Sequence, residues 1–389
     1  MRRVYLDYAA TTPLHPEVRG AMEPFFGSIF GNPSSIHSFG REARLAVEQA
    51  RQEVAALIGA DPAEIVFTSG GTEADNLAVL GAARLRREKG RKVVVSAVEH
   101  HAVLNACRHL ERREGFEVVL LPVDGHGRVN PEELLRVLDG QTVLVSVILA
   151  NNETGTIQPV GELARLCRER GVLFHTDAVQ AVGHIPVNVR ELGVDLLSLS
   201  AHKFYGPKGA GALYVRRGVR LEPLFQGGGQ ERRIRPGTEN VAGIVGLGAA
   251  CRVAAREMAE RESRVAALRR RLEEGIRRLF PEARVNGHPE ERLPGILNVV
   301  FPGVEGEALL LNLDLKGVAA SAGAACSAGS VEPSHVLLAM GLSEDLAHGA
   351  VRFSLGRESR EEDVEHVLEV LPPILERLRR MRAVGEARA

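Results

Sequence analysis

The sequence predicts an open, mainly parallel α/β sheet in a large domain, followed by a smaller α+β domain. Short apolar runs rich in β-branched residues alternate with helical patterns as far as residue 215, which is typical of such a sheet. A long charged segment then ends the alternation, and strands and helices are mixed after it. At 389 residues the chain is also longer than one compact core usually needs, which favours two domains.

The apolar runs are the predicted strands of the sheet, several of them buried on both faces. They lie at 64–69, 92–97, 117–123, 142–150, 171–178, 195–200 and 211–215. Helical patterns separate many of them and each ends at a glycine, a common helix stop, at 73–90, 102–115 and 160–171. Because sheets of this kind bind ligands beyond the carboxyl ends of their strands, we expect functional residues directly after the strands.

The character of the sequence changes near residue 250. The charged segment 256–280 predicts one long helix, which we expect to be a solvent-exposed connector. After it we predict strands and helices of the small domain at 295–301, 306–313, 317–323, 350–356 and 361–381. We expect the N-terminal arm to pack with this part, so the predicted domains are 14–255 and, together, 1–13 and 256–389.

Composition and charge exclude several classes of function. The formal net charge of −1 provides no general attraction for nucleic acid or an anionic membrane. The sequence shows neither an 18-residue apolar span nor an apolar segment behind a basic start, so we expect a soluble cytoplasmic protein. Its cysteines form no CxxC pair, which argues against a disulfide framework or a zinc site; they are Cys107, Cys167, Cys251 and Cys326.

The stretch GGTEADN, residues 70–76, follows the first predicted strand and begins a helix. Gly71 and Thr72 offer bare backbone N–H groups, a hydroxyl and the positive end of a helix dipole, which together suit a phosphate. A simpler interpretation is that Thr72 is an ordinary helix N-cap.

Two further strand ends carry polar residues. His100 and His101 follow the second strand, and adjacent histidines on a strand point to opposite faces, so they rarely share a metal. We therefore predict no metal site, and expect one histidine in a pocket and the other in a structural role. The stretch NNETG, 151–155, is either a polar turn or a set of amides and a carboxylate that orients a ligand.

The last two parallel strands end in Asp177 and in Ser200 to Lys203. An unpaired buried carboxylate is costly, so Asp177 needs a cationic partner such as a ring nitrogen. Lysine is scarce in this chain, which contains only Lys89, Lys92, Lys203, Lys208 and Lys316. Lys203 and Lys208 alone fall where a pocket is expected.

A phosphate seat, a carboxylate, a stacking histidine and a lysine are the groups that pyridoxal phosphate (PLP) requires. A lysine carries its aldehyde as a Schiff base, a carboxylate pairs with its ring nitrogen, and the ring is an electron sink. A nicotinamide cofactor is the rival. No GxGxxG opens a helix after a strand, however, and no GxxxxGK[ST] is present.

Cys326 differs from the other cysteines in its surroundings. It lies in 319–330, which consists almost entirely of Ala, Gly and Ser, so we expect an accessible thiol suited to a mobile nucleophile. The other three cysteines are expected to be small buried hydrophobes. Downstream, Arg352 and Arg357 offer guanidinium groups that match a carboxylate; we expect one to bind an amino-acid substrate and the other to form a surface ion pair.

With these motifs in order, the chain resembles the PLP-dependent cysteine desulfurases of the NifS/IscS type, in the class V aminotransferase group of fold type I. The likeness extends over nearly the whole chain, through YLDYAATTP, GNPSSIHSFG, TSGGTEADN, VEHHAV, NNETG, HTDAVQ, SAHKFYGPKG, RPGTEN, ACSAG and VRFSLGR. The loop around Cys326 is similar to that of the longer-loop class, because the RxGHHC pattern of the other class is absent. The resemblance implies a seven-stranded sheet flanked by helices.

The resemblance also implies roles for individual residues. Lys203 would carry the cofactor as a Schiff base, His100 would stack on its ring and move protons, and Asp177 would pair with the ring nitrogen. Cys326 would accept the sulfur. The remaining cofactor contacts would come from Gly71, Thr72, Asn152, Gln180 at the ring hydroxyl, Ser200 and His202 at the phosphate, and Thr238 across the interface of a homodimer. The substrate carboxylate and its surroundings would contact Asn32, Asn152 and Arg352.

The implied reaction takes sulfur from L-cysteine, gives L-alanine and leaves a persulfide on Cys326. The persulfide would pass to an acceptor protein for iron–sulfur cluster assembly or for thiolation of cofactors or tRNA. Two alternatives stay open: a PLP enzyme of another type, such as an aminotransferase or selenocysteine lyase, and a sulfur-relay or scaffold protein without turnover. An aminotransferase does not need Cys326, which favours the desulfurase.

Overall fold

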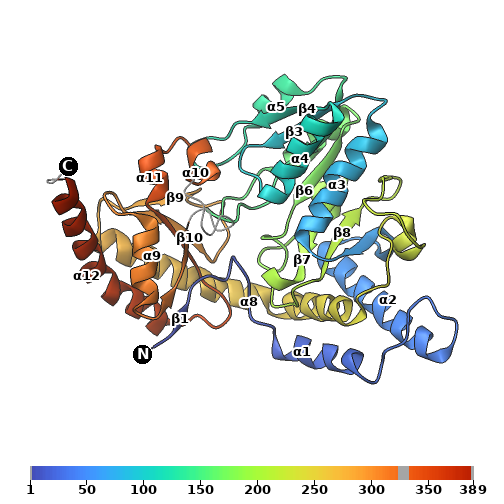
Figure 1. Cartoon of the computed structure of the whole chain (residues 1–389), viewed down its shortest axis with the longest axis horizontal. Coiled ribbons are helices and arrows are strands. Elements are labelled where there is room, and N and C mark those ends of the chain that lie inside the picture. Colours follow the sequence, from blue (N-terminus) through green and yellow to red (C-terminus); the bar gives the residue numbers. More distant parts are fainter. Residues whose placement is uncertain (1, 323–332, 387–389) are drawn as a thin grey trace.

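The structure, a computed structural model, describes residues 2–322 and 333–386, the last five of them without their side chains (Figure 1). Cys326, the predicted sulfur acceptor, lies outside the described residues. None of the helices in these two ranges combines the length and the hydropathy needed to cross a bilayer.

A seven-stranded sheet forms the centre of the molecule, as predicted, with the strand order β2-β8-β7-β6-β5-β3-β4. Only β8 runs antiparallel to its neighbours; β3 to β7 are parallel. The strands are β2 (Ile65–Thr68), β3 (Lys92–Ser96), β4 (Glu117–Leu121), β5 (Thr142–Ser146), β6 (Leu173–Asp177), β7 (Leu196–Ser200) and β8 (Gly211–Val215). The strand predicted at 142–150 is thus shorter, although Val147 and Leu149 still donate backbone hydrogen bonds to β6 at 3.1 and 2.8 Å.

Helices cover both faces of this sheet (Figure 1). On β3, Val94 packs into one core and Val93 and Val95 into the other, so both faces are buried. The large-domain helices are α1 (Pro16–Met22), α2 (Ser38–Ile58), α3 (Gly71–Arg86), α4 (His101–Glu114), α5 (Pro131–Val137), α6 (Val160–Glu169) and α7 (Val189–Leu192). The predicted stop at Gly90 is wrong, since α3 ends at Arg86, whereas Gly115 does cap α4 in a left-handed conformation, with φ of 71°.

A second, antiparallel sheet has the order β12-β13-β10-β9. A separate parallel pair joins β1 to β11, so the N-terminal arm does pack with the C-terminal part. The predicted strand 317–323 is therefore split between two sheets. The elements are β1 (Val4–Tyr5), β9 (Arg284–Asn286), β10 (Ile296–Val300), α9 (Gly306–Asp314), β11 (Val318–Ala319), β12 (Ser321–Ala322), α10 (His335–Ala339), α11 (Glu344–His348), β13 (Ala350–Ser354) and α12 (Glu361–Glu386).

The helix α8 (Val241–Leu279) begins earlier than predicted and is not a solvent-exposed connector. Leu247 belongs to the core of the large sheet and Val265 to the core of the small one. Arg261 and Glu262 are buried as well. They form an ion pair at 2.7 Å, which offsets part of the free-energy cost of burying their charges. The predicted boundary between the two domains, after residue 255, falls inside α8, which runs unbroken through it. The division of the chain at that point therefore stays a prediction.

Candidate active site

A cavity of about 280 Å³ lies beyond the carboxyl ends of the parallel strands. Its lining combines the ends of β6 and β7 with the start of α3, the N-terminal arm and β13. The lining residues are Ala9, Ala10, Gly71, Thr72, Asp75, His100, Ile148, Asn152, Asp177, Val179, Gln180, Ser200, His202, Lys203 and Arg352. Most of the predicted site residues are therefore brought together in one place, although their roles stay predictions.

One end of the cavity is built to receive an anion. The helix α3 starts at Gly71 with Gly70 as its N-cap, and no described side chain caps it, so the interpretation of Thr72 as N-cap is wrong. A Cβ atom on Gly71 would lie 2.7 Å from Val179, which shows why glycine is needed there. Ser200 and His202 line this end and also an adjoining hollow of about 390 Å³.

Lys203 ends the short 3₁₀ helix η3 (Ala201–Lys203) that follows β7. Its Nζ donates hydrogen bonds to the carbonyl oxygens of Ala9 and Ala10, at 2.7 and 2.9 Å. The N-terminal arm therefore faces the lysine amine. Lys208, the other pocket candidate, lines only the adjoining hollow in the described structure, so the geometry favours Lys203.

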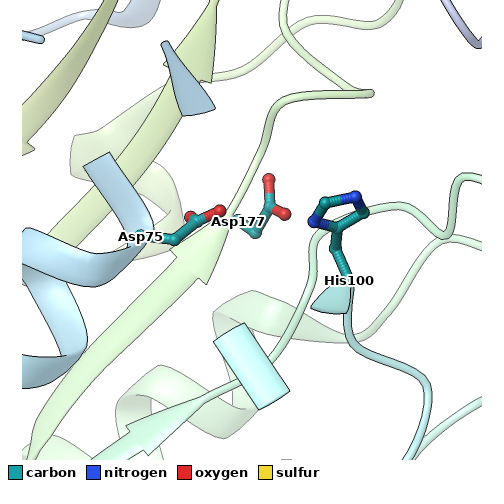
Figure 2. Close-up of side chains that lie close together, drawn as sticks. All are labelled: Asp75, His100 and Asp177. Atoms are coloured by element: carbon teal, nitrogen blue, oxygen red, sulfur yellow. The ribbon is translucent and has the colours of Figure 1, made fainter. Parts of the chain in front are cut away.

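Asp75, His100 and Asp177 converge at the floor of the cavity, with one ligand atom from each within 4.8 Å of the other two (Figure 2). Burial raises the pKa of Asp177 to about 6, against the hydrogen bond from the Val179 N–H and the positive charge of Lys203. Burial, and then the charge of Asp177, raises the pKa of Asp75 as well. Two buried carboxyl groups facing one cavity attract a cation, and a protonated pyridine nitrogen is such a cation.

His100 is the N-cap of α4, and its Nδ1 accepts the backbone N–H of Ala102 at 3.1 Å. Burial, with the nearby charge of Lys203, lowers the pKa of His100 to about 4, so the ring is neutral at pH 7. Its proton then resides on Nε2. His101 does not line the cavity and instead packs on the ring of His335, with centroids 4.7 Å apart. His100 thus lies in the pocket and His101 outside it. Both residues lie at the start of α4, however, and not on a strand.

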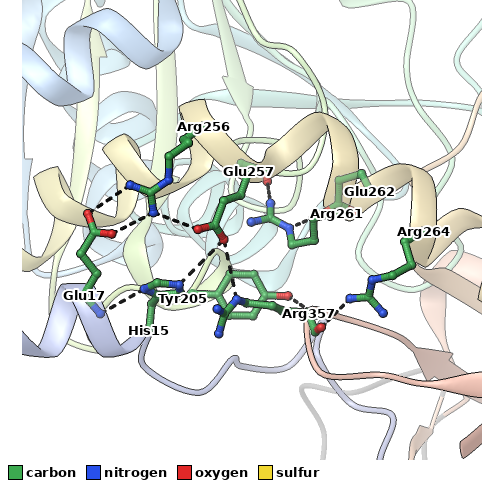
Figure 3. A network of polar contacts seen from close by, with 10 residues as sticks. His15, Glu17, Tyr205, Arg256, Glu257, Arg261, Glu262, Arg264 and Arg357 are labelled. Carbon is green, nitrogen blue, oxygen red and sulfur yellow. Dashed lines mark hydrogen bonds and ion pairs between the residues drawn. The ribbon is translucent and has the colours of Figure 1, made fainter.

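Arg352 reaches the cavity from β13 in the small sheet. It is 1% exposed, and its guanidinium donates to the Asn152 carbonyl at 2.8 Å and to Asp7 at 2.9 Å. Arg357 lies instead in a polar network beside α8, where its Nε is 3.7 Å from a carboxylate oxygen of Glu257 (Figure 3). Of the two arginines, the structure therefore places Arg352 where a substrate carboxylate could bind.

Among the described residues, two of the predicted site residues are not in the cavity lining. Asn32 is exposed, and its side chain accepts the N–H of Ser34. Thr238 lines a separate hollow of about 150 Å³, with Ser69 and Glu239. Cys326 lies outside the described residues. The sequence analysis missed Asp75; the only signal was an acid beside Ala74 and Leu77 on a helix face that packs against the sheet.

The class V aminotransferase family model, described as "Aminotransferase class-V", matches residues 4–367. The chain belongs to this family. A cysteine desulfurase IscS of Dictyoglomus turgidum is 53% identical over 378 residues, 97% of this chain and 96% of that protein. A cysteine desulfurase IscS of Methanosarcina thermophila is 51% identical over 380 residues, 98% of this chain and 94% of that protein. A solved structure titled "NIFS-LIKE PROTEIN" has a TM-score of 0.91 at 41% identity, covering 97% of this chain and 100% of its own.

Class V enzymes of this kind use pyridoxal phosphate, and the residues in the cavity fit it. An amine lies at one side, a pair of buried acids at the floor and an uncapped helix start at one end. The Asp75 Oδ1 atom is buried without a described hydrogen-bond partner, which shows that the floor carries more acceptor capacity than the protein itself uses.

Proposed function

We propose that this protein is a PLP-dependent cysteine desulfurase, which converts L-cysteine into L-alanine and passes the sulfur on as a persulfide. The observation that carries the proposal is the meeting of Lys203, Asp177, His100 and Arg352 in one cavity. Identities near 50% to proteins named cysteine desulfurase, over nearly the whole chain, support it.

When bound, the cofactor withdraws electrons from the substrate's Cα, so that the Cα proton can leave. Lys203 is the amine that binds the cofactor aldehyde, and Asp177 holds the proton at the ring nitrogen. Gln180 is the proposed partner of the ring hydroxyl; at present its Nε2 donates to the Ala9 carbonyl at 2.7 Å. The phosphate contacts the start of α3 and the turn after β7, through Gly71, Thr72, Ser200 and His202.

Proton transfer falls to Lys203 and His100. Lys203, once free of the aldehyde, takes the Cα proton and returns it. His100 exchanges protons only through Nε2, because its Nδ1 is occupied by the Ala102 N–H. Since the neutral His100 ring carries its proton on Nε2 at pH 7, it is able to donate that proton to a substrate group and to take one back afterwards.

Arg352 is the proposed anchor of the substrate carboxylate, next to Asn152. The incoming carboxylate would share or replace the contact between Arg352 and Asp7. The Cys326 thiolate then attacks the substrate sulfur: the Cβ–S bond breaks, an S–S bond forms, and Cβ keeps the electron pair and takes up a proton. L-Cysteine and the Cys326 thiol thus yield L-alanine and a Cys326 persulfide. The role of Asn32 near the carboxylate stays a proposal.

The segment 26–45 supports a homodimer. It exposes several large apolar side chains in a short stretch, with Ile36 91% exposed, and the others are Phe26, Phe30, Phe39 and Leu45. A second copy of the chain is the partner we propose for this surface. In that dimer the partner subunit's Thr238 would reach the phosphate end of the cavity, beside Ser200. Sedimentation of wild type and of an Ile36→Glu variant tests this: the variant should dissociate.

We further propose that the enzyme works in the cytoplasm and delivers sulfur to an acceptor protein for iron–sulfur cluster assembly or for thiolation. The three described cysteines are free thiols, which suits a reducing compartment. Mass spectrometry of persulfide transfer to candidate acceptors identifies the partner.

The desulfurase proposal is tested with a Cys326→Ser variant. It should still bind the cofactor and L-cysteine but form no persulfide, while wild type releases one L-alanine for each sulfur. Wild-type turnover that consumes a keto acid instead would indicate an aminotransferase, and an absence of turnover by the PLP-loaded wild type would favour a relay or scaffold. A Cys326→Ser enzyme that forms persulfide at the wild-type rate would rule out the assigned nucleophile.

A further inference from the structure

His184 contacts the backbone of Lys203, although it does not itself line the described cavity. Its Nε2 lies 2.9 Å from the Lys203 carbonyl oxygen, and its Nδ1 lies 3.1 Å from Oε1 of Glu262. The side chain is largely buried, at 16% exposure. The proposed reaction assigns it no role, and nothing in the sequence pattern singled it out.

Hydrogen-bond geometry determines how many protons the His184 ring carries. The Lys203 carbonyl can only accept, so Nε2 must bear a proton. Oε1 of Glu262 also accepts from the Arg261 Nε at 2.7 Å, so this oxygen is already an acceptor. Burial raises the pKa of Glu262, but its pKa is lowered overall and the Arg261 guanidinium pairs with it at 2.7 Å, so Glu262 is a carboxylate. Nδ1 must then bear a proton too, and His184 is an imidazolium ion.

The same α8 pair supports the turn that carries the lysine. The Arg261 guanidinium lies 5.0 Å from the ring centroid of Tyr205, and Arg261 also donates to the Gly183 carbonyl. Tyr205 is buried and has φ of 70°, which is strained for a residue with a side chain. Its hydroxyl accepts the backbone N–H of Arg357 at 2.7 Å (Figure 3). Strain of this kind persists only where several contacts hold the backbone.

We propose that His184 is a positioning residue, held as an imidazolium between Glu262 and the Lys203 carbonyl, that fixes the backbone from which Lys203 reaches the cofactor. A charge-assisted bond on that carbonyl is roughly twice as strong as a neutral one. Among the described residues, the other polar side chains near His184 are Arg261 on α8 and three that line a small cavity with it: Tyr8, Gln180 and Ser354. The inference rests on the proposed function of Lys203.

Three variants at this position separate a positioning role from simple packing. His184→Leu removes both bonds and should speed release of the cofactor about tenfold, since a buried hydrogen bond to a charged group is lost. His184→Gln keeps a neutral donor and should fall between it and wild type. His184→Lys supplies a cation with three donors and should restore slow release. The melting temperatures of the cofactor-free proteins show how much of the faster cofactor release comes from general destabilisation of the fold.

Two further variants complete the set. Glu262→Gln should release the cofactor about as fast as His184→Gln, because a His184 ring that loses its second proton still donates a neutral hydrogen bond to the Lys203 carbonyl. His366→Gln is the matched control: His366 also contacts a backbone carbonyl, that of Lys316 at 3.0 Å, but on the exposed surface of α12. It should release the cofactor at the wild-type rate. Cofactor release from His184→Leu at the wild-type rate would overturn the proposal.

Nitrogen NMR of histidine-labelled holoenzyme provides a direct measurement. The His184 signals, assigned by their loss in His184→Gln, should show both ring nitrogens protonated at pH 7 and one of them deprotonated in Glu262→Gln. A neutral His184 ring in wild type at pH 7 would contradict the inference. Failure of the proposed function is seen differently, as PLP-loaded wild type that turns over no L-cysteine, and it leaves the NMR result intact.

Discussion

The floor and the rim of the cavity are built in different ways. The floor, taken here together with the lysine beside it, comes mainly from strand ends, with Asp177 at the end of β6 and Lys203 just after β7. These ends lie side by side because parallel strands end at one edge of the sheet. The rim comes from segments far apart in the sequence: Ala9 and Ala10 in the N-terminal arm and Arg352 on β13. The floor suits groups that a cofactor needs permanently, whereas the rim is set by the packing of the small sheet against the large one.

Breaking the floor at its lysine should have the largest effect. Lys203→Ala removes the amine that binds the aldehyde, so turnover should fall by about three orders of magnitude or more. The absorbance of the bound cofactor, before and after borohydride, reports the lost covalent bond. Lys208→Ala is the control, because Lys208 lines only the adjoining hollow in the described structure, and it should keep the bond. Equal loss of the bond in both variants would contradict the assignment.

Breaking the floor at its acid should come second. Asp177→Asn removes the charge that holds the ring-nitrogen proton, so turnover should drop by about 10²–10³-fold while much of the cofactor stays bound. Asp75→Asn tests whether the second acid shares this task. Because burial and the charge of Asp177 raise the pKa of Asp75, this neutral replacement should change turnover far less, and turnover of the two variants at several pH values makes the comparison.

Breaking the rim should affect substrate binding more than cofactor binding. Arg352→Ala should raise the KM for L-cysteine about 10–100-fold, since a buried charge-assisted pair is lost, with little change in cofactor content. Arg357→Ala is the matched control, because its guanidinium lies beside Glu257 and outside the cavity, and its KM should stay within about twofold of wild type. Steady-state kinetics beside cofactor absorbance separates the two effects. Loss of cofactor from Arg352→Ala would place this arginine in the floor.

The last effect leaves turnover aside and concerns the pH dependence of stability at Glu153, the residue next to Asn152 of the cavity lining. Burial raises the pKa of Glu153 to about 7, against the hydrogen bond from Ser334 and the charge of Arg352. Between pH 4.5 and pH 7 the folded state keeps this proton and the unfolded chain does not, so the group's contribution to stability falls as pH rises, by up to about 3 kcal/mol.

Glu153→Gln should remove this part of the pH dependence, and urea unfolding of the cofactor-free protein at pH 5 and pH 7 measures it. The other shifted groups cancel in the difference between the two proteins. An unchanged difference between the two pH values would show that Glu153 is ionised in the folded state.

The sequence by itself determined the large sheet and the chemistry at its strand ends. Periodic apolar runs specify strands, and a parallel sheet places their ends together, so Asp177, Ser200, His202 and Lys203 could be assigned to one site without coordinates. Because lysine is scarce in this chain, few residues were candidates for the lysine that binds the cofactor.

Only the tertiary structure decided which distant groups join that site and what charge they carry. Asp75 was missed because a single buried acid on an otherwise apolar helix face has no periodic signal. The many charges of α8 predict a surface connector, yet Arg261 and Glu262 pair with each other in the interior. They contact the lysine turn through Tyr205 and His184. Burial and pairing belong to contacts between remote segments, and local sequence does not encode them.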